Sequence, residues 1–108
     1  MIVSFAEDNG SYSAAYKNFF DWASRIDQKV FQDKPTVFLA TSPGPGGAGS
    51  VLASAKGSDR FFGGDLKGAV SVANFHDIFD ANTGRITKPS ALANLTAAAE
   101  PLALQEVD

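Results

Sequence analysis

The sequence predicts an α/β fold with a parallel sheet of three strands, in the order β-α-β-α-β-α. Three short apolar runs alternate with three segments in which apolar residues recur at helical spacing. Strands that alternate with helices form parallel sheets joined by right-handed crossovers. The length of 108 residues and the apolar fraction of 44% suit one globular domain.

Composition narrows the classes of function. The net charge is −3, whereas proteins that neutralise phosphates are normally basic, so we expect no nucleic-acid partner. The absence of cysteine excludes disulfides and thiol chemistry, and a single histidine, His76, gives no reason to expect a metal site. No apolar run approaches the ~20 residues of a membrane span. The N-terminus shows no signal-peptide pattern, so we expect a cytoplasmic protein that binds no membrane.

The three strands are expected at residues 2–5, 35–41 and 68–73. The first is a short apolar run with two β-branched residues. The second is almost continuously apolar, which is typical of a strand buried on both faces of a parallel sheet. It begins with Pro35, and a proline is tolerated at the first position of a strand.

The first helix is expected to begin after Ser11 or Ser13, because either serine can cap it. This helix has more aromatic residues than a single apolar stripe requires. They widen its apolar face to an arc of roughly 160°, at about 100° of rotation per residue. Two interpretations stay open: a bulky core helix, or a helix that packs on its own sheet and on a partner subunit. The most regular apolar stripe consists of Ala15, Phe19, Trp22, Ala23 and Ile26.

The remaining elements follow from the same patterns. The turn after the second helix is expected to place Phe61 and Phe62 in the core. Pro89 suits the first turn of a last helix, which Pro101 should kink or end near Glu100. The second helix carries its apolar stripe at Ala48, Val51, Leu52 and Ala55.

Two loops are suited to ligand binding. Residues 7–11 follow the first strand and residues 42–47 follow the second, and each loop leads into a helix N-terminus. Parallel sheets bind ligands at the carboxyl ends of their strands, and the free amides of a helix N-terminus favour electron-rich atoms. Glycines in both loops let the backbone approach a flat ligand closely. If the two strands are neighbours, the loops line one crevice; the alternative is two ordinary turns.

Both loops resemble signatures of one protein family. The run Glu-Asp-Asn-Gly-Ser at 7–11, continued by Lys17-Asn18 and Asp21-Trp22, is similar to the first flavin loop and helix of NAD(P)H-dependent FMN reductases. The run Ser-Pro-Gly-Pro-Gly-Gly at 42–47 is similar to their second flavin loop. These proteins are flavodoxin-like and include chromate and azo-dye reductases. The resemblance extends over essentially the whole chain.

The resemblance implies FMN as cofactor and NAD(P)H as co-substrate. It also implies a small-molecule electron acceptor: a quinone, an azo compound, a metal oxyanion or free flavin. In this family the flavin itself takes the hydride, so no catalytic side chain is expected. The residues expected to contact the flavin are Glu7, Asp8, Asn9, Gly10, Ser11, Tyr12, Ser42, Pro43, Gly44, Pro45, Gly46 and Gly47.

The resemblance further implies that residues 1–108 are the C-terminal part of a flavodoxin-like domain. The chain begins where the family's third strand begins, so we expect it to lack the first two strands and the loop that holds the FMN phosphate. The strand at Ile2–Phe5 would then be an apolar edge that pairs with another chain or forms a homo-oligomer. The alternative is a non-enzymatic oligomerisation or interaction fragment that does not bind flavin on its own.

Overall fold

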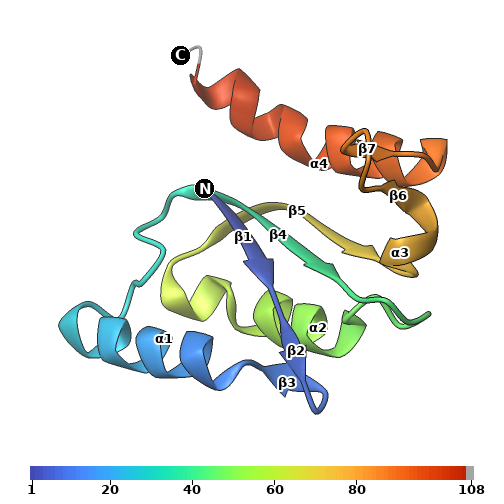
Figure 1. Ribbon diagram of the computed structural model, residues 1–108. Coiled ribbons are helices and arrows are strands. Elements are labelled where there is room, and N and C mark those ends of the chain that lie inside the picture. Colours follow the sequence, from blue (N-terminus) through green and yellow to red (C-terminus); the bar gives the residue numbers. More distant parts are fainter. Residues whose placement is uncertain (107–108) are drawn as a thin grey trace.

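The computed structural model shows a three-stranded parallel sheet between two layers of helices (Figure 1). The sheet consists of β1 (Ile2–Phe5), β4 (Pro35–Thr41) and β5 (Asp65–Val72), in the order β1-β4-β5. All neighbouring strands are parallel. The α/β class and the parallel sheet of three strands expected from the sequence are therefore confirmed.

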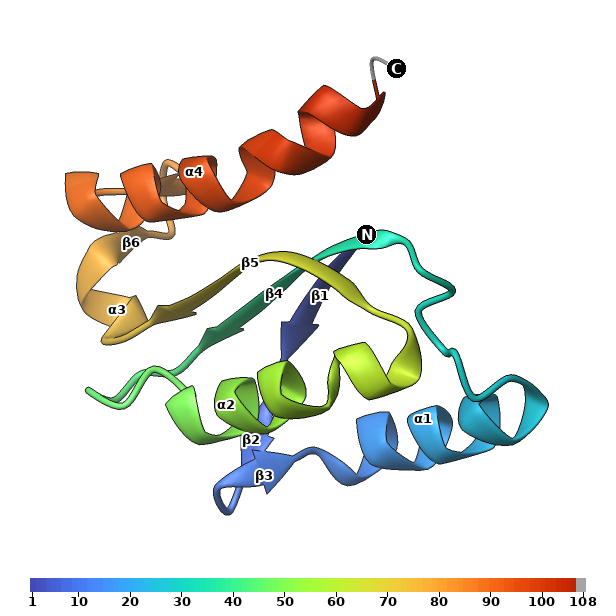
Figure 2. The same cartoon turned by 180° about the vertical axis from the view of Figure 1, so that it is seen from behind.

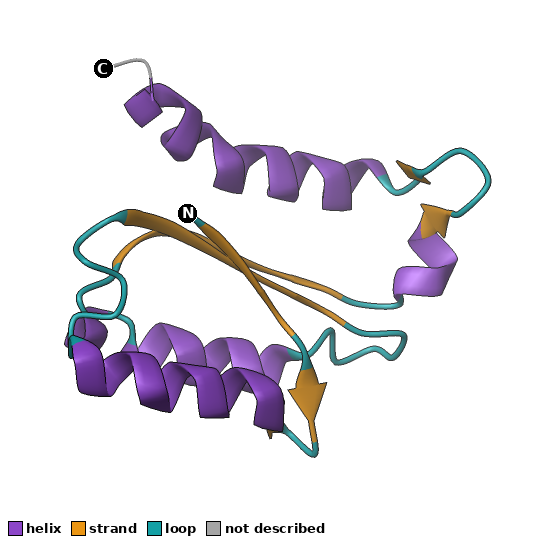
Figure 3. Ribbon diagram, turned by 60° about the vertical axis from the view of Figure 1, so that its left-hand side comes forward, coloured by secondary structure: helices purple, strands orange, loops and turns teal. Residues whose placement is uncertain are grey.

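Three longer helices cover the sheet. One face carries α1 (Ala14–Ile26) and α2 (Gly49–Ser58), which lie side by side (Figure 3). The opposite face carries α4 (Pro89–Glu106), as Figure 2 shows from behind. This arrangement leaves the carboxyl edge of the sheet to the loops.

Six short elements complete the chain. The structure describes residues 1–106, apart from the side chains of Asp8 and of residues 103–106. Within that range, no helix combines the length and the apolar character needed to cross a bilayer. The short elements are β2 (Glu7–Asp8), β3 (Ser11–Tyr12), the 3₁₀ helix η1 (Arg60–Phe62), α3 (Phe75–Ile78), β6 (Phe79–Asp80) and β7 (Arg85–Ile86).

The middle strand, β4, is buried on both faces, as its continuous apolar run predicts. Val37 and Phe38 point to opposite faces and are at most 1% exposed. In contrast, β1 pairs with β4 alone among the described residues, with Ile2 opposite Val37 and Phe5 opposite Ala40. Ile2 is 56% exposed, so β1 is an apolar edge strand.

The main core lies between the sheet and the α1–α2 layer and is rich in aromatic rings. The ring of Phe5 packs edge-on against Tyr16 and Phe38, with 5.1 Å between centroids in each pair. Such tilted arrangements are favourable for aromatic pairs. The predicted stripe of α2 faces this core, and its residues Ala48, Val51, Leu52 and Ala55 are all buried.

Helix α1 presents a different side to the core than its most regular stripe predicts. Tyr16 and Phe20 pack on the core, whereas Phe19, Trp22 and Ile26 are exposed. Of the two interpretations of this helix, a core position for Trp22 is not seen within the chain, where its side chain is 65% exposed. The rotation of the helix is set at its start, because Ser13 Oγ accepts a hydrogen bond from Tyr16 N (3.2 Å) as the N-cap.

Two further expectations need correction. Phe62 packs on Phe20, with 4.7 Å between ring centroids, but Phe61 is 66% exposed and does not enter the core. Helix α4 continues through Pro101 to Glu106, so of the two outcomes expected near Glu100, a kink or an end, the end does not occur. The helix instead bends away from the sheet toward its C-terminal end (Figure 2).

Candidate functional site

The loops that follow β1 and β4 meet at the carboxyl edge of the sheet. Glu7 Oε1 accepts a hydrogen bond from Val51 N at 2.9 Å. Val51 lies in the first turn of α2, which begins just after the second loop, 44 residues from Glu7 in the chain. The structure therefore brings residues 7–12 and 42–47 to the same side of the molecule.

The first loop is a β-hairpin. Strands β2 and β3 pair antiparallel, with Asp8 opposite Ser11, and turn through Asn9 and Gly10. Both turn residues have positive φ, 51° and 81°, which is the geometry of a type I′ turn. Asn9, Gly10 and Ser11 are exposed, while the side chain of Asp8 lies outside the described part of the chain. The hairpin was not among the elements expected from the sequence, which placed a polar loop here, although Asn-Gly is a strong hairpin signal.

Tyr12 is separated from the other predicted contact residues. Its ring lies 5.8 Å from that of Phe5 and stacks on Tyr16 at 5.3 Å, on the core side of the hairpin. Burial raises the pKa of Tyr16 to about 12, and the nearby Tyr12 adds to this rise. Tyr12 thus anchors the hairpin to α1 rather than lining the opening between the loops.

The second loop is held by the segment that follows β5. Ser42 N donates to Val72 O (3.2 Å), which continues the pairing of the two strands. Beyond the strands, Asn74 N donates to Gly44 O (2.9 Å) and Phe75 N donates to Ser42 O (3.1 Å). These bonds fix the backbone of the loop without using the amide N–H groups of Gly44, Gly46 and Gly47.

The glycines of the second loop differ in whether the fold could accommodate a side chain at their position. Gly47 has a φ of +60°, and a Cβ there would lie 3.1 Å from Ala73 N and would collide with the side chain of Ser71. Ser71 Oγ also donates to Gly47 O at 2.7 Å, so Gly47 is needed by the fold. A Cβ at Gly44 or Gly46 would meet nothing within 4 Å. The backbone at Gly44, between the exposed Pro43 and Pro45, and at Gly46, which follows Pro45, is therefore open to a ligand.

Glu7 has a role that the sequence analysis missed. The N-cap residue of α2, Ala48, has a φ of 58° and provides no side-chain hydrogen bond. The Glu7 carboxylate fills that gap by accepting from Val51 N, and a negative charge is favourable at a helix N-terminus. The positive end of α2 is thus partly neutralised within the protein. No local pattern could have revealed this contact, because it joins residues 44 apart.

The two loops fit the ring of FMN better than its phosphate. Residues 7–12 and 42–47 contain no lysine or arginine but two carboxylates, Glu7 and Asp8. Open backbone at Gly44 and Gly46 suits the polar rim of a flat, uncharged ring. A phosphate would find no cationic side chain in either loop.

Comparison with known proteins agrees with this assignment of the loops to a flavin-dependent family. The family model described as NADPH-dependent FMN reductase matches residues 1–77. The match runs from β1 into α3 and includes both loops, whereas β6, β7 and α4 lie outside it. No curated protein matches the chain. Since the match covers well over half of the sequence, the chain belongs to the NADPH-dependent FMN reductase family.

Proposed function

We propose that this chain functions in NAD(P)H-dependent reduction of FMN, with the flavin ring held between residues 7–11 and 42–47. The observation that carries the proposal is the hydrogen bond from Val51 N to Glu7, which joins the two loops at the carboxyl edge of the sheet. Bound FMN would supply the redox chemistry, taking a hydride from the nicotinamide and passing electrons on to the acceptor. Family membership favours this function over that of an interaction fragment without flavin.

The residues of the two loops bind and orient rather than react. The amide N–H groups of Gly44 and Gly46 would donate to the polar rim of the ring, and both glycines leave room for it. Asn9 and Ser11 add exposed polar side chains from the tip of the hairpin. Glu7 holds that hairpin against α2, so it positions the first wall of the site.

The free edge of β1 supports a proposal about completion of the site. Neither loop carries a cation for the phosphate, and β1 has a partner on one side only among the described residues. A further strand from another chain, or from a second copy, would extend the sheet beside the first loop. If that strand belongs to a different chain, the groups that bind the phosphate would come from its own loop, because residues 7–12 of a second copy carry no cation.

The choice of acceptor and compartment follows from the same chemistry. We propose a small-molecule acceptor, namely a quinone, an azo compound, a metal oxyanion or free flavin. A cytoplasmic location fits a reaction that consumes NAD(P)H.

Titration with FMN and with riboflavin, followed by quenching of flavin fluorescence, tests the binding site. Riboflavin has the ring without the phosphate, so the two dissociation constants should agree within about threefold because the loops have no cation. Absence of binding of either flavin at ~100 μM protein would refute the proposal.

A pair of glycine variants locates the site. Gly44→Leu places a side chain in open space at the second loop and should weaken flavin binding at least ~10-fold, which corresponds to about 1.4 kcal/mol. Gly57→Leu makes the same change at an equally open position near the far end of α2 and should leave binding unchanged. Equal binding by the wild type and Gly44→Leu would place the flavin elsewhere.

A further inference from the structure

We propose that the hollow between α1 and α2 binds a small uncharged aromatic molecule that carries a hydroxyl group, of the phenol or naphthol type. The hollow has a volume of about 300 Å³ and is lined by residues of β1, β4, α1 and α2. None of the described side chains of residues 7–11 and 42–47, between which the flavin ring is proposed to bind, lines it. It is therefore a second site, which is called the aromatic hollow below.

The aromatic hollow exists because large and small side chains face each other across it. Helix α1 contributes Tyr16 and Phe20 to one wall, whereas α2 contributes Ser54, Ala55 and Ser58 to the other. The side chains of α2 are too short to fill the space up to the rings, and every residue of α1 stays at least partly exposed. Well-packed interiors leave few voids larger than a water molecule, so a hollow of this size calls for an occupant.

Five aromatic rings line the aromatic hollow and follow one another in a closed circuit. Their successive centroids lie 5.1, 5.9, 6.0, 5.7 and 5.1 Å apart. These separations fall within the ~4.5–7 Å at which aromatic rings attract one another edge-on or offset, and a further ring can join the circuit at the same distances. The lining therefore favours an aromatic occupant over an aliphatic one. The circuit consists of Phe5, Tyr16, Phe20, Phe31 and Phe38.

Volume sets the size of the occupant. The aromatic hollow is at the lower end of the ~300–1,000 Å³ of small-molecule sites. An apolar cavity of about 150 Å³ holds one benzene molecule, so a hollow of twice that volume has room for two fused rings. A flavin, with three fused rings and a ribityl chain, exceeds that size.

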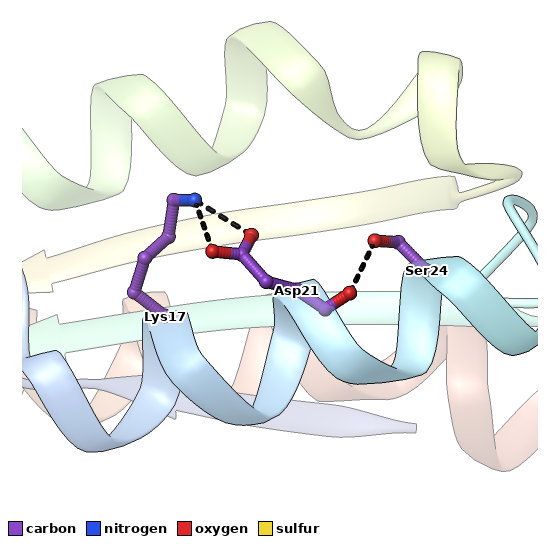
Figure 4. A network of polar contacts seen from close by, with 3 residues as sticks. All are labelled: Lys17, Asp21 and Ser24. Carbon is purple, nitrogen blue, oxygen red and sulfur yellow. Dashed lines mark hydrogen bonds and ion pairs between the residues drawn. The ribbon is translucent and has the colours of Figure 1, made fainter.

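Charges at the mouth of the aromatic hollow cancel, which favours an uncharged occupant. Lys17 Nζ donates to both carboxylate oxygens of Asp21, at 2.6 and 2.9 Å. Figure 4 shows this pair on the side of α1 that faces α2, with Ser24 next to it along the helix. Among the described residues that line the hollow, these two alone are charged. An ionic ligand would lose its water without gaining a free partner of opposite charge.

Two serines of the lining call for a hydrogen-bond donor on the occupant. On α1, Ser24 Oγ donates to Asp21 O at 2.8 Å. On α2, Ser58 Oγ donates to Ser54 O at 3.2 Å. A hydroxyl group has a single proton, so both serine oxygens have only lone pairs left for a ligand. A phenolic O–H can donate to either of them, whereas a quinone carbonyl or an ether oxygen cannot.

Isothermal titration calorimetry with 2-naphthol tests the proposal, because this probe has two fused rings and one O–H group. We expect one molecule to bind per chain with a Kd of ~10–100 μM. 2-Methoxynaphthalene has the same rings but no donor, and it should bind at least ~3-fold more weakly. Absence of 2-naphthol binding at ~500 μM, or equal affinity for the two compounds, would overturn the proposal.

Substitutions on α2 locate the bound probe. Ser54→Phe adds a ring to the wall of small side chains and should weaken 2-naphthol binding at least ~10-fold by filling the hollow. Ala53→Phe is the matched control: it adds the same ring at the preceding exposed position, which is turned by about 100° and does not line the hollow, so binding should be unchanged. Unchanged binding by Ser54→Phe would place the probe elsewhere and overturn the proposal.

Removal of the two hydroxyl groups tests their role without filling the hollow. The double variant Ser24→Ala with Ser58→Ala leaves neither serine oxygen to accept from the probe. Its affinity for 2-naphthol should fall to that for 2-methoxynaphthalene, while its affinity for 2-methoxynaphthalene stays that of the wild type. A preference for 2-naphthol that survives in the double variant would refute the role of these serines.

Titration in the presence of FMN tests whether the two sites are separate. The Kd of 2-naphthol should be the same with and without ~1 mM FMN, because the aromatic hollow and the opening between the loops are lined by different residues. Displacement of 2-naphthol by FMN would overturn the assignment of a second site. The 2-naphthol titration itself needs no flavin, so failure of this proposal and failure of the proposed flavin site can be told apart.

Discussion

Replacing Glu7 with alanine removes the hydrogen bond that joins the first loop to α2. The bond is 2.9 Å long and partly buried, and the residue of its donor, Val51, is 0% exposed. Hydrogen bonds to charged groups contribute about 1.5–3 kcal/mol, and the loss of a helix cap costs about 0.5–2 kcal/mol. Since water can partly replace the carboxylate, we expect Glu7→Ala to lower the free energy of unfolding by about 1–2 kcal/mol.

Thermal and urea unfolding measure this loss. For a chain of this size the melting temperature should fall by roughly 5–10 °C, while the slope of the free energy of unfolding against urea concentration should stay unchanged. Glu7→Gln keeps an acceptor oxygen without the charge, so its effect should be about half as large. Flavin binding should weaken in the same order, because the hairpin loses its attachment to α2.

A matched control separates the hydrogen bond from the general effect of losing a carboxylate. Glu100 is exposed on α4, and Glu100→Ala should change the free energy of unfolding by less than ~0.5 kcal/mol. If Glu7→Ala lowers the free energy of unfolding no more than Glu100→Ala does, the hydrogen bond of Glu7 to α2 does not stabilise the fold. The argument that Glu7 holds the two loops together is then refuted.

Two further predictions concern a glycine and a buried carboxyl group. Gly47→Ala should destabilise the fold by about 1–3 kcal/mol in urea unfolding, because of the positive φ and the contact with Ser71, whereas Gly44→Ala should be nearly neutral. Burial, with a smaller contribution from Asp65, raises the pKa of Asp59, and its Oδ1 has no hydrogen-bond partner among the described residues. The Asp59 carboxyl group therefore binds its proton more tightly in the folded state than in the unfolded state. Protonated Asp59 stabilises the fold at acid pH, and this stabilisation is lost as the pH rises through the raised pKa. Asp59→Asn should be more stable than the wild type at pH 7 by about 1–2 kcal/mol, and the difference should shrink toward acid pH; equal stability at pH 7 would contradict this.

The sequence predicts most of the framework because its strongest signals are strictly local. The continuous apolar run of β4 identifies a central strand, and the stripe of α2 identifies the face that is buried. The rotation of α1 could not be predicted in the same way, since aromatic residues occupy both of its sides. The structure resolves this choice through the Ser13 cap and the stacking of Tyr12 on Tyr16.

The candidate site also combines features that the sequence predicts with features that depend on tertiary structure. Both loops could be placed after the correct strands, because glycine and proline mark them clearly. The hairpin was missed although Asn9-Gly10 signals it, since no alternating apolar residues flank the turn. The cap that Glu7 provides for α2 depends on tertiary structure alone, and periodicity carries no information about it.

The bonds that hold the second loop also bear on how freely the sequence can vary. Their donors, Asn74 and Phe75, belong to the segment matched by the family, while the last helix lies beyond it. The hydrogen bonds that hold the opening between the loops thus all lie within the matched part of the chain. Residues 78–108 can therefore change over evolution without removing any of these bonds.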